Sequence, residues 1–326
     1  MSESQETVRG ARIGTTLPGW RRVVGGAALV AFWGWLLVRW FNDWVLNAGF
    51  RPADRQPFLP VAPFESAAAA LHSLAASLGV LGVPLSWLAG AFAFVAGAIP
   101  SLPALAAGVW LTLVLTASSI VFGFVIAVPL SVARVYGGRG TRWLALSYTE
   151  LIRGTPLLAQ LFVLYFGTGL SGVIRGLPMV GTGIVPDQAI WVAIVGFTIN
   201  SSAYQAEYIR SALLSVESGQ LTAARSIGLS QLAGIRYVVL PQGLRYAIPG
   251  WSNELVYLIK YSSLATFITV RELFGQAEAI ANNTYRFTEL FVTAGLFYLA
   301  LVLSASLVMS YVEEYTAVPG IGGRER

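Results

Sequence analysis

The chain has 326 residues, of which 56% are hydrophobic and 11% are charged. Soluble domains carry roughly 25% charged residues, so this chain has too few charges to cover a water-exposed globule and is predicted to be an integral membrane protein. Its net charge of +5 is scattered singly between apolar runs, which argues against nucleic acid as a partner, and the lack of cysteine excludes disulfides, thiolate zinc sites and iron–sulfur clusters.

The N-terminal part combines a polar tail with one apolar stretch. Residues 1–22 are polar, and the run at 23–45 is long enough to cross a bilayer. Tryptophans cluster with Arg39 toward its far end, a composition typical of the membrane interface. We therefore expect an uncleaved transmembrane helix, followed by a proline-rich, charged connector at 51–65 that lies in water.

Residues 66–133 contain no formally charged side chain. Glycine and proline interrupt this tract, and only its last part, 108–133, is a strong candidate for a span. Residues 66–99 are expected to form an external or interfacial apolar helical insert, with a short two-helix hairpin as the alternative. Together with the first helix and the tail, this insert makes up an N-terminal part over 1–104.

Apolar stretches continue along the rest of the chain. Further spans are predicted at about 155–170, 189–209, 249–268 and 289–311. The predicted fold is all-α: a polytopic membrane helical bundle of about six spans, in which a five-helix core follows the N-terminal helix. The core extends over 105–315, and 316–326 form a short tail.

The distribution of arginine predicts the orientation. With a cytoplasmic N-terminus and alternating strong spans, the inside segments hold fourteen arginines and the outside segments hold five. Cytoplasmic loops carry an excess of Lys and Arg, so both termini of this multi-pass protein are expected on the cytoplasmic side of the cell membrane. One extra crossing at 66–99 would invert the pattern, and this insert is therefore expected to cross either twice or not at all.

The chain lacks the sequence patterns of common enzymatic sites. It has no GxxxxGK[ST] phosphate loop, no HExxH and no GxSxG. Its one histidine, His72, lies in an Ala/Leu/Ser-rich stretch and is interpreted as an interfacial residue. We expect a transport subunit rather than an enzyme, without catalytic residues, a metal site or a cofactor of its own.

The longest predicted cytoplasmic loop, 207–248, is too polar to span and too apolar to be disordered. It is interpreted as two short helices with a hinge. Thr222 suits the start of the first helix because a hydroxyl accepts from free amides, and Gly228 suits the turn because it tolerates positive φ. Ser230 suits the start of the second helix and Pro241 its end. We expect this loop to dock onto a partner; an amphipathic loop lying on the membrane is the alternative.

The same loop resembles the EAA loop of ABC-importer membrane subunits, which reads EAA, three residues, Gly, nine residues and I-x-L-P. The matching positions are Thr222, Ala223, Ala224, Gly228, Leu240 and Pro241. Thr222 departs from the family's Glu, and Val238 replaces its Ile. Four more segments, in the expected order and spacing, resemble the polar amino-acid branch of these permeases: GVWLTLVLT (108–116), ELIRGTPLLAQLFVLYFG (150–167), NSSAYQAEYIRSAL (200–213) and NELVYLIKYSSLA (253–265).

The resemblance covers roughly 105–315 and implies the membrane half of an ATP-driven importer of polar amino acids. It implies alternating access around a site near the bilayer midplane, and a dimer with itself or with a sister permease. It also implies ATP-binding subunits, which hold ATP and Mg and dock on the EAA-like loops, and an extracytoplasmic solute-binding protein. The alternatives are an importer of another small polar solute and, less favoured, an ATP-independent secondary transporter.

Polar residues recur at helical spacing on two successive predicted spans. They are Asn200, Tyr204 and Glu207 on the first span and Asn253, Tyr257 and Lys260 on the next. Polar groups inside a membrane are costly and mark functional paths, so these residues are candidates for a substrate pathway; hydrogen bonding between helices is the alternative. Lys260, the only Lys in the chain, is expected to reach Glu207, a carbonyl or the substrate, or to snorkel toward the cytoplasm.

One further pair of charges lies before the predicted span at 155–170. Glu150 and Arg153 stand three residues apart in ELIRGTP, a spacing that allows an ion pair across one helical turn. A contact of Arg153 with a dimer mate or with the EAA-like loop is the other interpretation. Pro156 suits the first turn of the helix that follows.

Overall fold

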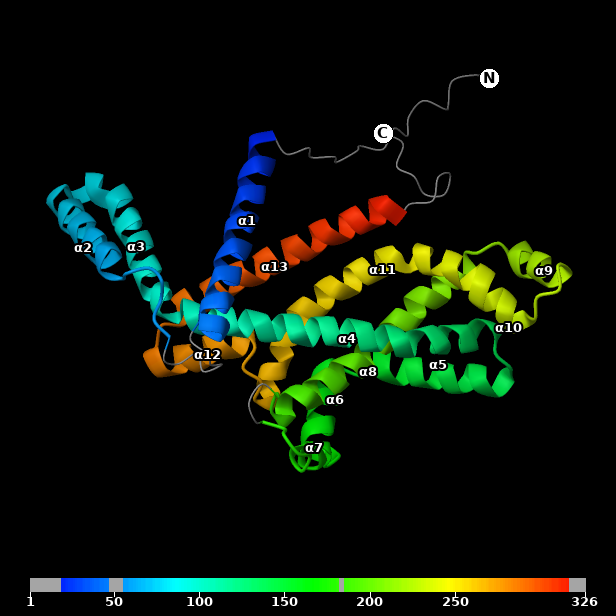
Figure 1. Ribbon diagram of the computed structural model, residues 1–326. Helices are drawn as coiled ribbons and strands as arrows, with labels where there is room; N and C mark the ends of the chain where they lie inside the picture. Colours follow the sequence, from blue (N-terminus) through cyan, green and yellow to red (C-terminus); the bar gives the residue numbers. More distant parts are fainter. Residues whose placement is uncertain (1–18, 47–54, 182–184, 317–326) are drawn as a thin grey trace, which may run out of the picture.

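The computed structural model describes residues 19–46, 55–181 and 185–316. Every regular element in these ranges is helical, which confirms the predicted all-α class. The bundle is built around four long helices that pack on one another (Figure 1). They are α4 (Leu102–Tyr136), α8 (Gln188–Leu214), α11 (Leu240–Tyr261) and α13 (Phe287–Thr316).

The contact between α4 and α8 is the most extensive in the bundle, and small residues line it. Gly123 of α4 is so close to α8 that a Cβ there would lie 3.2 Å from the backbone nitrogen of Ser202. Ala127 and Ala206 are fully buried in the same region. Small residues allow helix backbones to approach closely in membranes, where packing rather than the hydrophobic effect drives association.

The predicted span at 155–170 is shorter and more broken than expected. After α4, α5 (Arg139–Arg153) runs back along α4 and α8, and the helix breaks before α6 (Leu157–Phe162) and a π-helical turn (Val163–Gly167). The break falls at Pro156, which disfavours a helical conformation in the residue before it. Residues 157–167 rise only about 16 Å, which is less than the roughly 30 Å hydrocarbon core. The chain therefore needs α5 and α6 together to run back along α4.

The first predicted helix is confirmed, and two tryptophan side chains attach it to α4 and to α13. α1 (Gly19–Phe41) continues as a π-helical turn, Asn42–Leu46. The indole nitrogen of Trp40 donates to the Ala106 carbonyl of α4 at 2.9 Å, and that of Trp33 donates to the Ser304 hydroxyl of α13 at 2.8 Å.

A buried ion network lies where α1 ends. The Arg39 Nε lies 2.9 Å from an Asp43 carboxylate oxygen, and the Arg55 Nη1 lies 3.1 Å from the other. Only 11% of the Arg55 side chain is exposed. Within the predicted connector, the Arg55 side chain is therefore largely buried against Asp43; Arg51 and Asp54 lie outside the described residues.

Residues 62–98 of the apolar insert fold as a helical hairpin. α2 (Ala62–Ser77) and α3 (Val83–Ala98) pack against each other and are joined by the 3-10 turn Gly79–Gly82 (Figure 1). At this turn a Cβ on Gly82 would lie 2.1 Å from the Ala75 carbonyl oxygen, so a glycine is needed for the close approach. The hairpin returns to the end from which it leaves, which is consistent with an even number of crossings.

A helix that the sequence did not reveal lies between α11 and α13. α11 continues into a 3-10 helix, Ser262–Ile268, which is followed by α12 (Leu273–Thr284). Glu272 caps α12 by accepting from the Gly275 amide at 2.9 Å. The same carboxylate, fully buried, accepts from three hydroxyls, those of Thr112, Thr266 and Tyr298, at 3.2, 3.0 and 2.5 Å. Four donors therefore compensate a charge that joins α4, α12 and α13.

Three described segments are long and apolar enough to cross a membrane on length and composition alone. They are Val23–Leu46, Gly79–Tyr136 and Phe287–Thr316. The spans predicted at 189–209 and 249–268 fall on α8 and α11, whose many polar residues lower their hydropathy. Those two helices carry the candidate residues.

We expect the substitution Gly123→Val to destabilise the bundle, because the valine side chain would collide with α8. Overpacking of this kind costs about 1–3 kcal/mol. Gly295→Val in α13 is the matched control, since nothing lies within 4 Å of a Cβ there. Thermal unfolding of the purified protein in detergent should show a lower Tm for Gly123→Val only; equal Tm values would contradict the close contact of α4 and α8.

Candidate functional site

The loop between α8 and α11 folds as two short helices, but its first helix starts earlier than expected. α9 covers Ser218–Ser226, so Thr222 lies in its middle. The Thr222 carbonyl accepts from the Ser226 hydroxyl at 3.1 Å, and the residue at the helix start, Glu217, makes no side-chain cap. The predicted capping role of Thr222 is therefore wrong, because the helix extends one turn further toward its N-terminus.

The turn and the second cap in this loop are as predicted. Gly228 has a φ of 91°, a conformation that L-residues with a side chain rarely adopt. The Ser230 hydroxyl accepts from the Ala233 amide at 3.3 Å at the start of α10 (Gln231–Gly234).

Pro241 does not end a helix. From α10 the chain stays helical through a π-helical turn, Ile235–Val239, and enters α11, whose first turn contains Pro241. The predicted role of Pro241 is wrong because a proline at the first turn of a helix loses no hydrogen bond that the helix needs.

The loop presents an apolar surface at one end of the molecule. α9 and α10 lie at the same end of the bundle as the α4–α5 turn (Figure 1). Ile227, Leu232 and Tyr237 are 80%, 73% and 66% exposed, whereas Ala224 is buried. Large apolar side chains exposed around one glycine turn are typical of a protein-binding surface.

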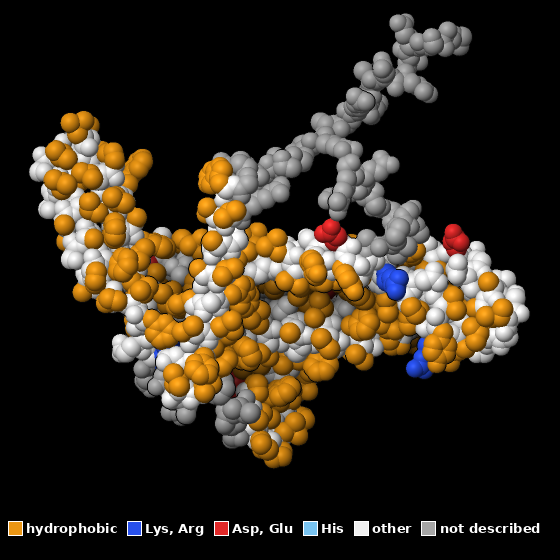
Figure 2. All heavy atoms as spheres, turned by 45° about the horizontal axis from the view of Figure 1, so that its top comes forward, with side chains coloured by type: hydrophobic (Ala, Val, Ile, Leu, Met, Phe, Trp, Pro, Cys, Tyr) orange, Lys and Arg blue, Asp and Glu red, His pale blue; other side chains and the backbone are white. Residues whose placement is uncertain are grey.

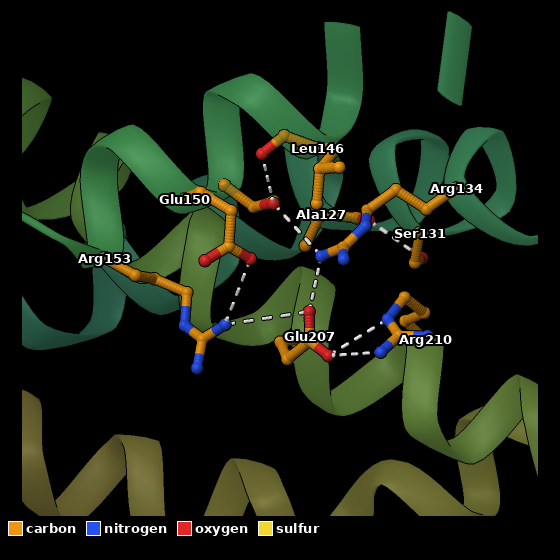
Figure 3. Close-up of polar contacts among 9 residues, drawn as sticks. Ala127, Ser131, Arg134, Leu146, Glu150, Arg153, Glu207 and Arg210 are labelled. Atoms are coloured by element: carbon orange, nitrogen blue, oxygen red, sulfur yellow. Dashed lines mark hydrogen bonds and ion pairs between the residues drawn. The ribbon is translucent and has the colours of Figure 1, made fainter. Parts of the chain in front are cut away.

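Glu207 of α8 is surrounded by guanidinium groups from three helices (Figure 3). Arg134 of α4 contacts its Oε2, Arg153 Nη1 of α5 lies 3.7 Å from the same oxygen, and Arg210 Nη2 lies 2.9 Å from Oε1. The predicted pair of Glu150 and Arg153 is also present, at 3.8 Å and on the exposed side. Three guanidiniums against two carboxylates leave this cluster, at the end of the bundle that carries the loop, positively charged.

The other two residues of the α8 stripe also face α5 and α6. Asn200 Nδ2 donates to Gln160 Oε1 at 3.1 Å, and Gln160 Nε2 donates to the Ile152 carbonyl at 2.7 Å. That carbonyl has no amide four residues on, because residue 156 is proline. The Arg153 guanidinium lies 5.4 Å from the centre of the Tyr204 ring. The α8 stripe thus braces the break between α5 and α6, and this geometry favours hydrogen bonding between helices.

The α11 stripe is exposed along its length. Asn253, Tyr257 and Lys260 all lie on the surface, and the rings of Tyr257 and Tyr261 stack with centroids 5.7 Å apart. Lys260 Nζ lies 4.7 Å from the centre of the Tyr257 ring. Lys260 and Glu207, both within the described part of the chain, do not make the predicted contact. Arginines already surround the Glu207 carboxylate.

One acidic side chain near the stripe was not singled out from the sequence. Glu254 is 4% exposed and lies within hydrogen-bond reach of Ser201 on α8. A Glu within an apolar predicted span, next to Asn253, was the signal that could have identified it. In the part of the chain that the structure describes, no group of three or more His, Cys, Asp or Glu side chains is placed to hold a metal ion.

Comparison with known proteins covers the region that carries these sites. The sequence model of the family described as "Binding-protein-dependent transport system inner membrane component" matches residues 119–316. The nopaline transport system permease protein of Agrobacterium fabrum is 38% identical over 216 residues, 66% of this chain and 88% of that protein. The glutamine transport system permease protein of Escherichia coli is 35% identical over 214 residues, 66% of this chain and 93% of that protein.

Solved structures share the fold. The crystal structure of an amino acid ABC transporter with histidines aligns with a TM-score of 0.56 at 31% identity, covering 66% of this chain and 94% of that one. An inward-facing methionine ABC transporter aligns with the same TM-score at 22% identity, covering 66% of this chain and 97% of that one; this likeness concerns the fold alone.

We expect Glu207→Gln to destabilise the protein, because three guanidiniums would lose their shared carboxylate. Removal of one partner of a buried ion pair destabilises a protein by about 3 kcal/mol or more. We expect the lower value here, because the Glu207 side chain is partly exposed. Glu150→Gln is the matched control and should cost less than about 0.5 kcal/mol, since that carboxylate is 58% exposed. Denaturant unfolding should show a larger loss of unfolding free energy for Glu207→Gln than for Glu150→Gln. Equal losses would contradict a stabilising role of the Glu207 cluster.

Proposed function

This chain belongs to the family of binding-protein-dependent transport system inner membrane components, and we propose that it is the membrane-spanning subunit of an ATP-driven importer of polar amino acids. The core at 105–315 dimerises with itself or with a sister permease and carries no ATPase site of its own. Separate ATP-binding subunits hold ATP and Mg, and an extracytoplasmic solute-binding protein delivers the substrate. Both termini lie in the cytoplasm.

The exposed loop of α9 and α10 is the observation that carries this proposal. Its apolar side chains stand around the turn at Gly228, beyond the ends of the long helices, where a separate subunit has access to them. α9 follows α8 after only three residues. A subunit that pulls or tilts this loop during ATP hydrolysis therefore moves α8 directly, and with it the arginine cluster at Glu207.

The polar stripe of α11 is the proposed contact for the substrate. Asn253, Tyr257 and Lys260 are exposed in one chain although α11 lies at the centre of the bundle, so a second permease facing this stripe would enclose a polar path. An amide, a phenol and an ammonium supply donors and acceptors for a zwitterionic head group. Asn200, Tyr204 and Glu207 of α8 do not contact the substrate in this proposal. They hold α5, α6 and α8 in position relative to one another.

The assembled transporter tests this function. In proteoliposomes that contain the permease, its ATP-binding subunit and the solute-binding protein, polar amino acids should stimulate ATP hydrolysis and accumulate in the lumen. Accumulation without ATP would identify a secondary transporter. If other small polar solutes stimulate ATP hydrolysis but no amino acid does, the chain is still an importer subunit, and polar amino acids are excluded as its substrates.

We expect Gly228→Val to uncouple ATP hydrolysis from transport. Valine at a φ of 91° is strained, at a cost of about 1–3 kcal/mol, and the turn would redirect α10 and its exposed side chains. Gly219→Val in α9 is the control, because its φ is ordinary and nothing lies within 4 Å of a Cβ there. Substrate-stimulated ATPase and copurification of the ATP-binding subunit are the readouts; normal transport by Gly228→Val would disprove the coupling role of this loop.

We expect Lys260→Met to insert normally but to transport poorly. Loss of a charge-assisted hydrogen bond to a substrate carboxylate, worth about 1.5 kcal/mol or more, would raise the KM for uptake about tenfold. Lys260→Arg keeps the charge and should retain most of the uptake. If Lys260→Met has an unchanged KM, the ammonium only snorkels along the Tyr257 ring and does not touch the substrate.

A further inference from the structure

The hairpin of α2 and α3 lies outside the matched family region and stands away from the long helices (Figure 1). Its base packs on α13 through the end of α3. Figure 2 shows many hydrophobic side chains, and no charged ones, on its visible face. Between 66 and 98 it carries no Lys, Arg, Asp or Glu. Neither the proposed transport path nor the coupling loop uses it.

Large apolar side chains are exposed on both arms of the hairpin and at its tip. Leu74 and Leu78 are exposed on α2, and Trp87 on α3. At the tip, Val80 and Leu81 are 88% and 82% exposed. No charged side chain interrupts this surface between 66 and 98, and charges are costly in lipid, so this pattern favours the hydrocarbon of the bilayer as the occupant.

The polar groups of the hairpin are satisfied within its own helices. The hydroxyls of Ser73, Ser77 and Ser86 each donate to the backbone carbonyl three residues earlier, at 2.7–2.8 Å. In a medium without water, internal hydrogen bonds of this kind are what polar groups require. Between 66 and 98, His72 is the only titratable group on this surface.

Charged residues lie at the base of the hairpin and indicate how deep it can enter the bilayer. Glu65 is exposed in the first turn of α2. At the other end, a Cβ on Gly97 would lie 3.4 Å from the side chain of Glu289 and 3.5 Å from that of Arg286. Such charges suit the headgroup level. Each helix has 16 residues and rises about 24 Å, which is shorter than the roughly 30 Å hydrocarbon core.

From these observations we infer that the α2–α3 hairpin is embedded in the hydrocarbon of the bilayer, with both ends on the extracytoplasmic side and its tip at 80–81 inside the lipid. It enters the membrane and returns without crossing it. The hairpin thereby anchors the extracytoplasmic ends of α4 and α13 in the lipid around the transport bundle.

The absence of native cysteine allows a direct test in the full-length protein assembled with its ATP-binding subunit. Single variants Leu81→Cys, Glu65→Cys and Arg139→Cys are exposed to a membrane-impermeant maleimide in intact spheroplasts and in inside-out vesicles. We expect Glu65→Cys to react only from the outside and Arg139→Cys only from the cytoplasmic side. Leu81→Cys should react from neither side until detergent is added.

A second measurement identifies what shields the tip. A fluorophore attached to Leu81→Cys in detergent, before reconstitution, should be quenched in vesicles of phosphatidylcholine that carry nitroxide-labelled acyl chains. Shielding together with quenching supports the inference. Reaction from the outside would place the tip in water, reaction from the cytoplasm would mean two full crossings, and shielding without quenching would mean a protein cover; each of these three results overturns it. Normal copurification of the ATP-binding subunit verifies that the variants fold.

Discussion

The pairing of one carboxylate with three guanidiniums holds together the end of the bundle that carries the loop of α9 and α10. Charges that are mostly buried among helices are costly unless they are paired, so separation of the ends of α4, α5 and α8 would leave the arginines around Glu207 without their shared carboxylate. Because α8 leads within three residues into α9, the same cluster lies between the loop and the bundle. Through Arg134 and Arg153, the Glu207 carboxylate connects the helix that leads into the loop with α4 and α5.

Two other charges fix the opposite end by the same physical rule. Glu272 has four donors from neighbouring elements, and Asp43 has the guanidiniums of Arg39 and Arg55. Between the two polar ends, small residues such as Gly123, Ala127 and Ala206 lie at the contact of α4 and α8. Buried apolar clusters that include Leu115, Phe197 and Ile209 pack the helices between these charged ends.

Interruptions in the helices explain where several of the polar groups are needed. Pro129 lies inside α4, Pro249 lies inside α11, and Pro156 follows the end of α5. A proline removes one backbone donor and leaves a carbonyl without its partner. At the break after α5, the Ile152 carbonyl accepts from the Gln160 amide and from the Thr155 hydroxyl, and Asn200 holds Gln160 in place. Side chains of α8 that look like a substrate path in the sequence are thus required by the backbone of α5 and α6.

The sequence by itself determined the membrane class, the all-α fold, the first helix and the two-helix loop with its turn at Gly228 and its cap at Ser230, because hydropathy and turn chemistry are local properties of the chain. Only the tertiary structure decided which polar residues are buried and with what. Glu207 meets Arg134 from 73 residues away, and Glu272 meets Thr112 from 160 residues away. A pattern with helical period places Asn200, Tyr204 and Glu207 on one face but does not say which neighbour covers that face. The roles of Thr222 and Pro241 were also wrong, because helix boundaries depend on packing of the whole loop, and single residues at those boundaries fit either end of a helix.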